Sequence, residues 1–219
     1  MKKSFIVSTV ALAFSALTII SCKKDAPVSS ETAQVETTAD GQVYVLDSIN
    51  SKLEWRGFKV FKTDNTSHFG TIRFESGELT AKDSILESGK FVADMNSLEN
   101  VDLASSPEDK AKLEGHLKSG DFFQVDQYPT ASYEITKVTP LTEGDYNTLI
   151  DGNLTMRGIT KPVSFKANVT VNESQVTIAS EPTDIMREDF GVKFQVPVAN
   201  GMIKNEINVQ FLVNAMAKN

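Results

Sequence analysis

Apolar and polar residues alternate along most of the chain beyond residue 42. The clearest run covers Ile159–Val171, where apolar residues share one face and polar residues the other, with a break only at Lys161. A second run covers Ile207–Ala215, and shorter runs cover Ile150–Met156 and Tyr133–Ile135. Alternation with a period of two predicts β-strands that bury one face, and a solvated second face is typical of antiparallel sheets.

Residues typical of turns separate these runs at fairly even spacing. They are Asp64-Asn65, Glu87-Ser88-Gly89, Glu143-Gly144-Asp145, Arg157-Gly158 and Asn172-Glu173-Ser174. Many strands with short connections indicate a sandwich or a closed barrel. The predicted strands Lys52–Lys62 and Asn205–Ala215 are longer than the usual length of about five or six residues. Such long strands favour a tall barrel over a compact sandwich.

One segment predicts a helix instead. The string Ser106–Asp109 offers an N-cap serine, a proline at the first helical position and acids in the first turn. The carboxylate of Asp109, three residues after the cap, can accept a hydrogen bond from the backbone N–H of Ser106. Leu113 and Leu117 fall on one face, and Lys118 with Gly120 provides a C-terminal stop. We expect a single helix of about three turns that covers one end or side of the sheet.

Composition and charge exclude several classes of function. The chain has 219 residues, of which 40% are apolar and 23% charged, the balance of a globular protein. Its formal net charge of -7 argues against a nucleic-acid partner, because phosphate binding needs a basic surface. A single cysteine and two histidines exclude an intramolecular disulfide, a paired-cysteine zinc site and a three-histidine metal site. We therefore expect no metal and no cofactor.

The first residues read as an export signal. Lys2 and Lys3 precede the apolar stretch Phe5–Ile20, which is shorter than the ~20 residues that span a bilayer as a helix. The string Ile19–Cys22 resembles the lipobox of bacterial lipoproteins, in which the signal is cut before the cysteine and the cysteine is acylated. We therefore predict a signal peptide over 1–21 and a membrane anchor of palmitate-type chains on Cys22. The alternative is a free thiol beside an ordinary cleavage site.

Residues 22–42 are rich in Ser, Thr, Glu and Ala. A segment of this composition cannot bury enough apolar surface to fold. We interpret them as a flexible acidic tether that holds the following domain roughly 25 Å from the lipid. The domain itself covers 43–219. The lipobox resemblance implies a location in the bacterial cell envelope, at the periplasmic or surface face of the outer membrane.

Four strings, in order along the chain, resemble the YceI-like family of lipid- and polyisoprenoid-binding proteins. They are Tyr44–Trp55, His116–Val138, Gly152–Lys161 and Arg187–Gly191. The chain departs from the family pattern at Asp102–Ser105, which is less regular. It departs again at Trp55, where the first strand of the family often carries another apolar residue. The second departure concerns a residue at the mouth or in the lining of the ligand-binding barrel, and it therefore bears on the identity of the ligand.

The resemblance implies an all-β fold, a lipocalin-like antiparallel barrel of about eight strands with one short covering helix. It implies that the barrel encloses an apolar tunnel for a long isoprenoid tail, with quinones and polyprenyl phosphates as ligands. It further implies homodimers and an envelope location. On this basis the chain is expected to carry or sequester such a lipid.

The candidates for the tunnel lining are aromatic and large apolar residues in or beside the predicted strands and helix. They are Trp55, Phe58, Phe69, Phe74, Phe91, Met95, Leu117, Phe122, Phe123, Tyr133, Leu154, Phe165, Phe194 and Phe211. The alternative is that these residues fill a dry core. The family resemblance, and not the number of phenylalanines, favours a cavity.

Three residues are candidates for the lipid head group. Arg157 ends a strand at a glycine turn, where a guanidinium can take a phosphate or quinone oxygen. Arg187 and His116 are the others, with Lys118 beside His116. The alternatives are an internal ion pair of Arg187 with its acidic neighbours, and a structural hydrogen bond for His116.

The sequence carries no motif that indicates catalysis. It contains no nucleophile elbow, phosphate loop, HExxH string or paired-cysteine string. We therefore expect a binding protein rather than an enzyme. Two alternatives stay open: an enzyme that acts on isoprenoid lipids, and a structural or interaction lipoprotein with a filled barrel.

Overall fold

A computed structural model describes residues 32–34, 40–61, 64–196 and 201–218 of the chain. The predicted signal peptide, Cys22 and most of the predicted tether lie outside the described residues. Within the described part, no helix is both long enough and apolar enough to cross a membrane.

The described residues form ten strands, one α-helix and one 3-10 helix. They are β1 (Gln42–Leu46), β2 (Lys52–Phe61), β3 (Asp64–Lys82), β4 (Ile85–Asn100), α1 (Pro107–Lys118), β5 (Thr130–Pro140), β6 (Thr148–Met156), β7 (Ile159–Val171), β8 (Gln175–Ser180), β9 (Thr183–Met186), η1 (Arg187–Phe190) and β10 (Gly201–Ala217). The predicted strand Ile159–Val171 coincides with β7, and the prediction of long strands is confirmed by β2 and β10.

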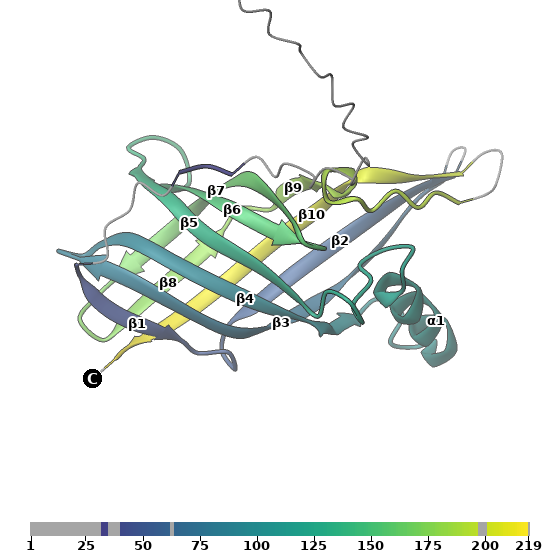
Figure 1. The fold of residues 1–219 in the computed structure, drawn as a ribbon, viewed down its shortest axis with the longest axis horizontal. Helices are drawn as coiled ribbons and strands as arrows, with labels where there is room; N and C mark the ends of the chain where they lie inside the picture. The colour runs from purple at the N-terminus through teal and green to yellow at the C-terminus, as the bar shows by residue number, and fades with distance from the viewer. Residues whose placement is uncertain (1–31, 35–39, 62–63, 197–200, 219) are drawn as a thin grey trace, which may run out of the picture.

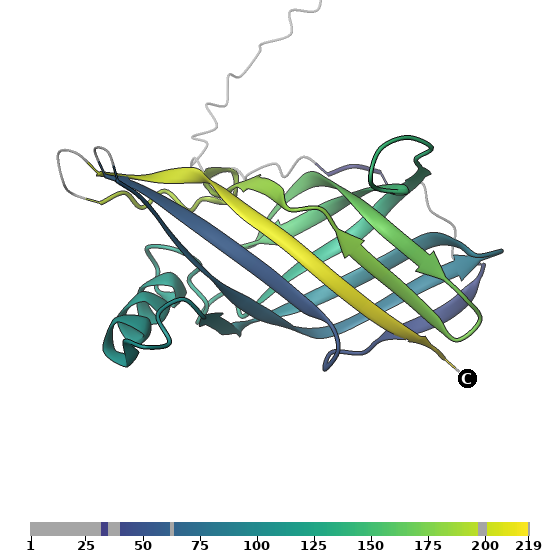
Figure 2. The same ribbon diagram turned by 180° about the vertical axis from the view of Figure 1, so that it is seen from behind.

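Eight of these strands close into a ring. Strands β2 to β8 follow one another as antiparallel neighbours, and β10 closes the ring by pairing with both β2 and β8. The strands cross the molecule diagonally and form a tall barrel, with α1 beyond one end and β1 at the other (Figures 1 and 2). The predicted antiparallel barrel of about eight strands with one α-helix is confirmed.

Two positions in the ring are filled by interrupted strands. β1 and β2 lie in line between β10 and β3, since each pairs antiparallel with both. The break at residues 47–51 is closed by Asn214 of β10, whose carbonyl accepts from the Asp47 N–H at 2.8 Å and whose N–H donates to Ser51 Oγ at 2.9 Å. β8 and β9 likewise share the other side of β10. β10 therefore joins four strands.

Three of the five predicted turns connect strands as expected. The segment 143–145 lies between β5 and β6, 157–158 between β6 and β7, and 172–174 between β7 and β8. Arg157 and Gly158 have φ angles of 51° and 70°, which a two-residue hairpin turn requires.

The other two predicted turns are wrong. Asp64-Asn65 belongs to β3, where Asn65 pairs with Val60 of β2. Glu87–Gly89 lies inside β4, and the hairpin turn is Asp83-Ser84, with φ angles of 51° and 64°. Gly89 is required for packing and not for a turn, because a Cβ there would collide with Cδ2 of Leu79.

The predicted helix forms and lies outside the ring, where it packs against β4 (Figure 1). It begins at Pro107 after Ser106, as expected, but the Ser106 side chain makes no capping bond, so the predicted reciprocal cap is wrong. The first helical bond runs instead from the Lys110 N–H to the Ser106 carbonyl at 2.9 Å. At the other end, Ser119 caps the helix by donating from Oγ to the His116 carbonyl at 2.8 Å.

The core differs between the two ends of the barrel. At the end near β1 lies a large apolar cluster, whose members Leu79, Ile178, Val213 and Ala215 have no exposed surface. We call this the plugged end. At the end near α1, a smaller cluster gathers around Trp55. The space left inside the barrel lies toward this second end.

Candidate functional site

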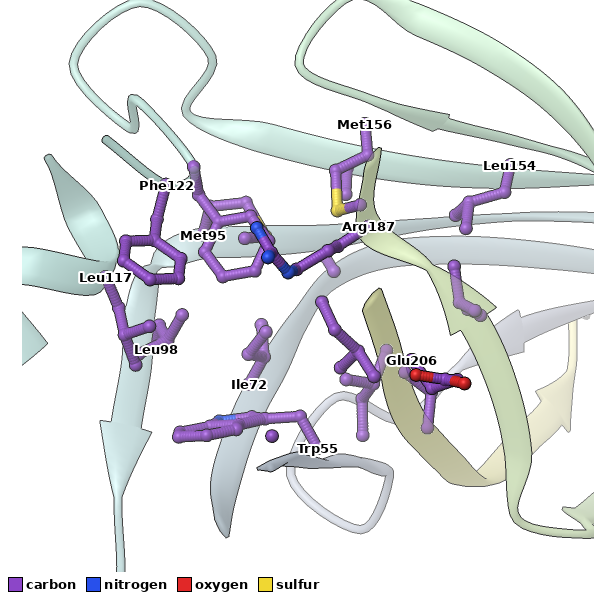
Figure 3. A pocket seen from close by; sticks show the side chains of 18 of the residues that line it. Trp55, Ile72, Met95, Leu98, Leu117, Phe122, Leu154, Met156, Arg187 and Glu206 are labelled. Carbon is purple, nitrogen blue, oxygen red and sulfur yellow. The ribbon is translucent and has the colours of Figure 1, made fainter. Parts of the chain in front are cut away.

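The main cavity of the barrel opens at the end near α1. Its volume is about 130 Å³, and its lining comes from β2 to β6, α1, β9, η1 and β10. We call it the mouth cavity. Figure 3 shows Trp55 on one wall, Leu117 and Phe122 at one side, Leu154 at the other and Arg187 between them. Apart from Arg187, Lys204 and Glu206, its lining residues are apolar or glycine.

The strand alternation explains how Trp55 reaches this cavity. Leu53, Trp55 and Gly57 of β2 line it, and opposite them on β3 stand Ile72 and Gly70. Gly70 leaves the room that the indole ring needs, because a Cβ at position 70 would lie 2.9 Å from Cζ2 of Trp55. The only tryptophan of the chain is therefore fixed in the wall of the mouth cavity.

A second, smaller cavity of about 60 Å³ lies deeper in the barrel. We call it the inner cavity. It shares four lining residues with the mouth cavity, namely Leu53, Leu154, Ile185 and Val209, which we call the collar. The rest of its lining is aromatic, namely Phe74, Phe91, Tyr133, Phe165 and Phe211, which we call the floor.

The floor is tightly packed. The ring of Phe165 meets those of Tyr133 and Phe211 edge to face, with centroids 5.3 and 5.0 Å apart, a favourable aromatic geometry. The Tyr133 hydroxyl lies 2.8 Å from the carbonyl oxygen of Val163 and 3.1 Å from that of Ile150. Burial, aided by the charge of Asp151, raises the pKa of Tyr133 far above its usual range, so the hydroxyl stays protonated and donates.

Arg187 brings a positive charge to the mouth cavity. Its side chain is 2% exposed, and it donates from Nε to the Lys204 carbonyl at 2.9 Å and from Nη1 to the Val192 carbonyl at 2.6 Å. A third bond from Nη2 to the Ile203 carbonyl is 3.3 Å long, while Oε1 of Glu188 lies 3.8 Å away. The partners of Arg187 are thus mainly carbonyls, and its contact with Glu188 is the weaker one.

Burial lowers the pKa of Arg187, and the charge of Glu188 acts in the opposite direction. An arginine nevertheless stays charged in a protein. Three neutral carbonyls hold this cation beside an apolar space, where electrostatic interactions are stronger than in water. The arrangement can hold an apolar group in the cavity and a polar or anionic oxygen next to the guanidinium.

The other two head-group candidates do not line the mouth cavity. Arg157 donates from Nη1 to the Gly191 carbonyl at 2.6 Å and from Nη2 to Oε1 of Gln124 at 3.3 Å. It therefore ties the β6–β7 turn to the end of η1 and to the segment after α1. His116 lies 3.1 Å from Oδ2 of Asp121 and packs edge to face against Phe122 and Phe194. His116 thus contacts a lining residue of the mouth cavity, Phe122, while Arg157 connects segments next to it.

Most of the predicted lining residues line one of the two cavities. Those at the mouth cavity are Trp55, Phe58, Met95, Leu117, Phe122, Phe123 and Leu154. Those at the inner cavity are Phe74, Phe91, Tyr133, Leu154, Phe165 and Phe211.

Phe69 and Phe194 line neither cavity. On β3 the even-numbered residues Gly70, Ile72 and Phe74 point inward, so Phe69 points out, is 37% exposed and lies 4.8 Å below the guanidinium carbon of Arg56. Phe194 follows η1 outside any strand and packs against Phe122, with ring centroids 5.3 Å apart.

The residues that sequence reasoning missed fall into two groups. Val209 and Ile72 stand at alternating apolar positions, so the strand pattern would have found them. Lys204 and Glu206 could not be found in this way. The register of β10 against β2 shifts between Ile203 and Ile207, which breaks the alternation and brings polar residues to the cavity wall. Among the described residues, no three His, Cys, Asp or Glu side chains gather to hold a metal ion.

Comparison with curated proteins places the chain among bacterial relatives. A UPF0312 protein of Shewanella denitrificans is 31% identical over 117 residues, which cover 51% of this chain and 60% of that protein. Another, from Pseudomonas putida, is 29% identical over 154 residues, which cover 65% of this chain and 76% of that protein. The chain thus spans about three fifths of the first relative's length.

Solved structures share the fold. BcnA of Burkholderia cenocepacia matches with a TM-score of 0.55 and 19% identity, over 77% of this chain and 98% of BcnA. A polyisoprenoid binding domain from Saccharophagus degradans matches with a TM-score of 0.54 and 17% identity, over 81% of this chain and 99% of that domain. The family model of the YceI-like domain matches residues 44–215, from β1 to near the end of β10. The chain belongs to the YceI-like domain family.

Proposed function

We propose that this protein binds an isoprenoid lipid, a quinone or a polyprenyl phosphate, and carries or sequesters it without changing it chemically. The observation that carries the proposal is the apolar mouth cavity with the buried guanidinium of Arg187 in its wall. The tail would occupy the cavity, and an oxygen of the head group would approach Arg187.

The physical chemistry of the cavity supports this ligand class. Each methylene moved from water into an apolar lining contributes about 0.8 kcal/mol. A guanidinium offers planar, paired N–H donors that suit phosphate oxygens. The Saccharophagus degradans domain of the same fold is described as polyisoprenoid binding, which makes this tail chemistry the first to test.

The envelope location belongs to the same proposal. The lipobox-like string ending at Cys22 supports an anchor on the outer membrane, at its periplasmic or surface face. A ligand that already resides in a bilayer gains little on moving into an apolar barrel, because both surroundings are apolar. Shuttling or sequestration therefore suits this protein better than extraction against a steep gradient. The homodimer that the resemblance implies stays a prediction.

The first test is mass spectrometry of an organic extract from the mature protein, purified under native conditions from its own cells. We expect a quinone or polyprenyl species in stoichiometric amount. Protein that carries no lipid beyond its own acyl chains would contradict the proposal and favour a structural or interaction role.

The role of Arg187 is tested by comparing geranyl phosphate with geraniol. The fluorescence of Trp55, the only tryptophan, reports occupancy of the mouth cavity. We expect the wild-type protein to prefer the phosphate by about tenfold or more, as for one charge-assisted hydrogen bond. Arg187→Met should lose this preference, whereas Arg56→Met, on the outer face over Phe69, should keep it. An unchanged preference in a folded Arg187→Met variant would place the head group elsewhere.

A further inference from the structure

We infer that Trp55 is a second hydrogen-bond donor to the ligand, and that it favours ligands with an acceptor oxygen apart from the one at Arg187. The inference rests on the proposed function and adds a residue that selects among the lipids which that function allows. It starts from the indole N–H of Trp55. This group is buried, and among the described residues its Nε1 atom has no hydrogen-bond partner.

A buried donor without an acceptor needs an explanation. The indole N–H of a buried tryptophan usually finds a partner, because an unpaired buried donor has lost its hydrogen bond to water. A phenylalanine would contribute a similar apolar surface to the cavity wall without a polar group. The wall is nevertheless shaped for the larger ring, since Gly70 leaves the room that the indole of Trp55 needs. An acceptor supplied by the ligand explains why an indole stands here.

The side chains around Trp55 do not supply this acceptor. Its neighbours on the inner face of β2, β3 and β10 are leucine, isoleucine, valine and glycine, which carry no side-chain acceptor. Glu206 is the only carboxylate in the lining of the mouth cavity, and it makes no hydrogen bond to Nε1 of Trp55. The acceptor must therefore come from a molecule inside the cavity.

A water molecule is poorly suited to this place. A buried water needs about two to four polar partners. In Figure 3 the nitrogen of Trp55 stands on the edge of the indole that is turned toward Ile72, which has an apolar side chain. An oxygen carried by an otherwise apolar ligand needs only the one bond to Nε1, because apolar contacts hold the rest of that ligand. The site therefore suits an acceptor oxygen within a lipid.

The two donors lie at different depths in the barrel. Arg187 is bonded to the carbonyls of Ile203 and Lys204, near the start of β10. Trp55 pairs instead with Val209, a collar residue further along the same strand. The donor on Trp55 thus lies deeper than the guanidinium, on the side from which the tail of the ligand continues inward.

This difference in depth separates the two candidate head groups. The oxygens of a phosphate are all bound to one phosphorus atom, so a phosphate at Arg187 leaves only the apolar tail beside Trp55. A quinone carries two carbonyl oxygens on opposite sides of one ring. One of them can approach Arg187 while the other, next to the tail, accepts from the indole N–H. Trp55 therefore favours a quinone over a polyprenyl phosphate.

The experiment removes the N–H and keeps the shape of the side chain. An amber codon at position 55 introduces β-(3-benzothienyl)alanine, in which a sulfur atom replaces the indole nitrogen. Calorimetry measures the affinities of ubiquinone-2 and geranyl phosphate, which have the same tail. We expect the affinity for ubiquinone-2 to fall about threefold to tenfold, as for one neutral hydrogen bond, and that for geranyl phosphate to change less than about twofold. Trp55→Phe, which also removes the N–H, should weaken the two ligands in the same order. A loss for ubiquinone-2 no larger than that for geranyl phosphate would overturn the inference.

Two further measurements separate a ligand contact from a structural one. Trp55 is the only tryptophan, so its indole N–H gives a single signal in a proton–nitrogen correlation spectrum. We expect this signal to move downfield when ubiquinone-2 binds and to stay in place with geranyl phosphate. In the ligand-free protein, removal of the N–H should not lower the melting temperature. Tyr133→Phe, which removes a buried hydroxyl with two carbonyl partners, should lower it.

The remaining outcomes distinguish this inference from the proposed function. A lower melting temperature of the ligand-free benzothienyl protein would assign the N–H to the fold and overturn the inference. Binding of geranyl phosphate without binding of ubiquinone-2 would also overturn it, and would leave the proposed function standing. Failure of the wild-type protein to bind either ligand would overturn the proposed function itself.

Discussion

Gly152 is a glycine because the ring of Tyr133 fills the space beside it. A Cβ at this position would overlap the tyrosine ring, lie 2.6 Å from the hydroxyl oxygen and lie 2.7 Å from the Glu134 carbonyl. We expect Gly152→Ala to lower the free energy of unfolding by about 1–3 kcal/mol, because the floor aromatics cannot shift freely. In a domain of this size the melting temperature should fall by about 2–4 °C per kcal/mol, which thermal unfolding by circular dichroism measures.

Gly115 provides the matched control for this substitution. It is exposed in α1, and a Cβ there would meet nothing within 4 Å. Gly115→Ala should therefore leave stability unchanged or raise it by up to about 1 kcal/mol, since alanine loses less chain entropy in a helix. Equal losses in the two variants would show that the Tyr133 contact is not the cause.

Single residues show where sequence reasoning works and where it fails. Phe165 and Phe211 stand in long alternating runs, so their inward direction follows from the pattern alone. Phe69 is the same type of residue but stands at an odd-numbered position of β3, whereas the inward residues of β3 are even-numbered. Only the pairing of Trp55 with Gly70 shows that Phe69 faces away from the barrel interior. Arg157 and Arg187 both follow strands, yet only the folded chain decides which guanidinium lines the cavity.

At the scale of elements, the segment between β4 and α1 is held by Asp102. Its Oδ1 accepts from the Phe69 N–H at 2.8 Å and from Nδ2 of Asn100 at 2.5 Å, and its Oδ2 lies 2.8 Å from Nδ1 of His68. Burial acts to raise the pKa of Asp102, but these three bonds outweigh it and hold the pKa below the ordinary value of 3.8. The carboxylate form is therefore favoured in the folded state.

Asp102→Ala should lower the free energy of unfolding by about 1–2 kcal/mol at pH 7, for the loss of bonds to a charged acceptor. A carboxyl group whose pKa is lowered in the folded state stabilises the fold at pH values above its ordinary pKa. This stabilisation is lost as the pH falls through the folded-state pKa. The difference between wild type and variant should therefore shrink below about pH 4, measured by urea unfolding at several pH values. Asp109→Ala, exposed on α1, is the control; a difference that persists at pH 2 would contradict this account.

The elements themselves were largely predictable, but their connections were less so. The helix start at Ser106-Pro107 and the strand β7 follow from local pattern. The β3–β4 turn was missed, because Asp83-Ser84 carries no glycine, while the glycine that suggested a turn, Gly89, makes room for Leu79 inside the sheet. A glycine marks either a turn or a close contact, and sequence alone does not separate the two.

At the scale of the whole molecule, part of the predicted tether is bonded to the barrel wall. The Ala33 N–H donates to Oδ1 of Asn153 at 2.9 Å, and Nδ2 of Asn153 donates to the Ala33 carbonyl at 3.0 Å. Asn153→Ala should release this segment and speed hydrogen exchange of the Ala33 amide by about fivefold, as for the loss of about 1 kcal/mol. Asn168→Ala, which removes an amide on the neighbouring strand β7, should leave that exchange unchanged. Equal exchange of Ala33 in the wild-type protein and Asn153→Ala would show that the contact is not held in solution.

The closed ring was anticipated from strand length, yet its construction was not. Nothing in the local pattern shows that β1 and β2 share one position, or that β8 and β9 share another. These arrangements depend on pairings between segments far apart in the chain, such as Tyr44 with Ala217. The same holds for the cavities, whose walls combine residues from nearly every strand.

The four-partner role of β10 has a consequence for how the protein folds. Because the chain is made, and on export is delivered, from its N-terminus, β2 and β8 emerge before the strand that joins them, so both edges stay unpaired until β10 appears. Pairings between such distant segments raise the contact order, and high contact order slows folding. Closure of the barrel is therefore a late and slow event. Chains that end before residue 201 would leave the strand edges of β2 and β8 unpaired and depend on chaperones to avoid aggregation.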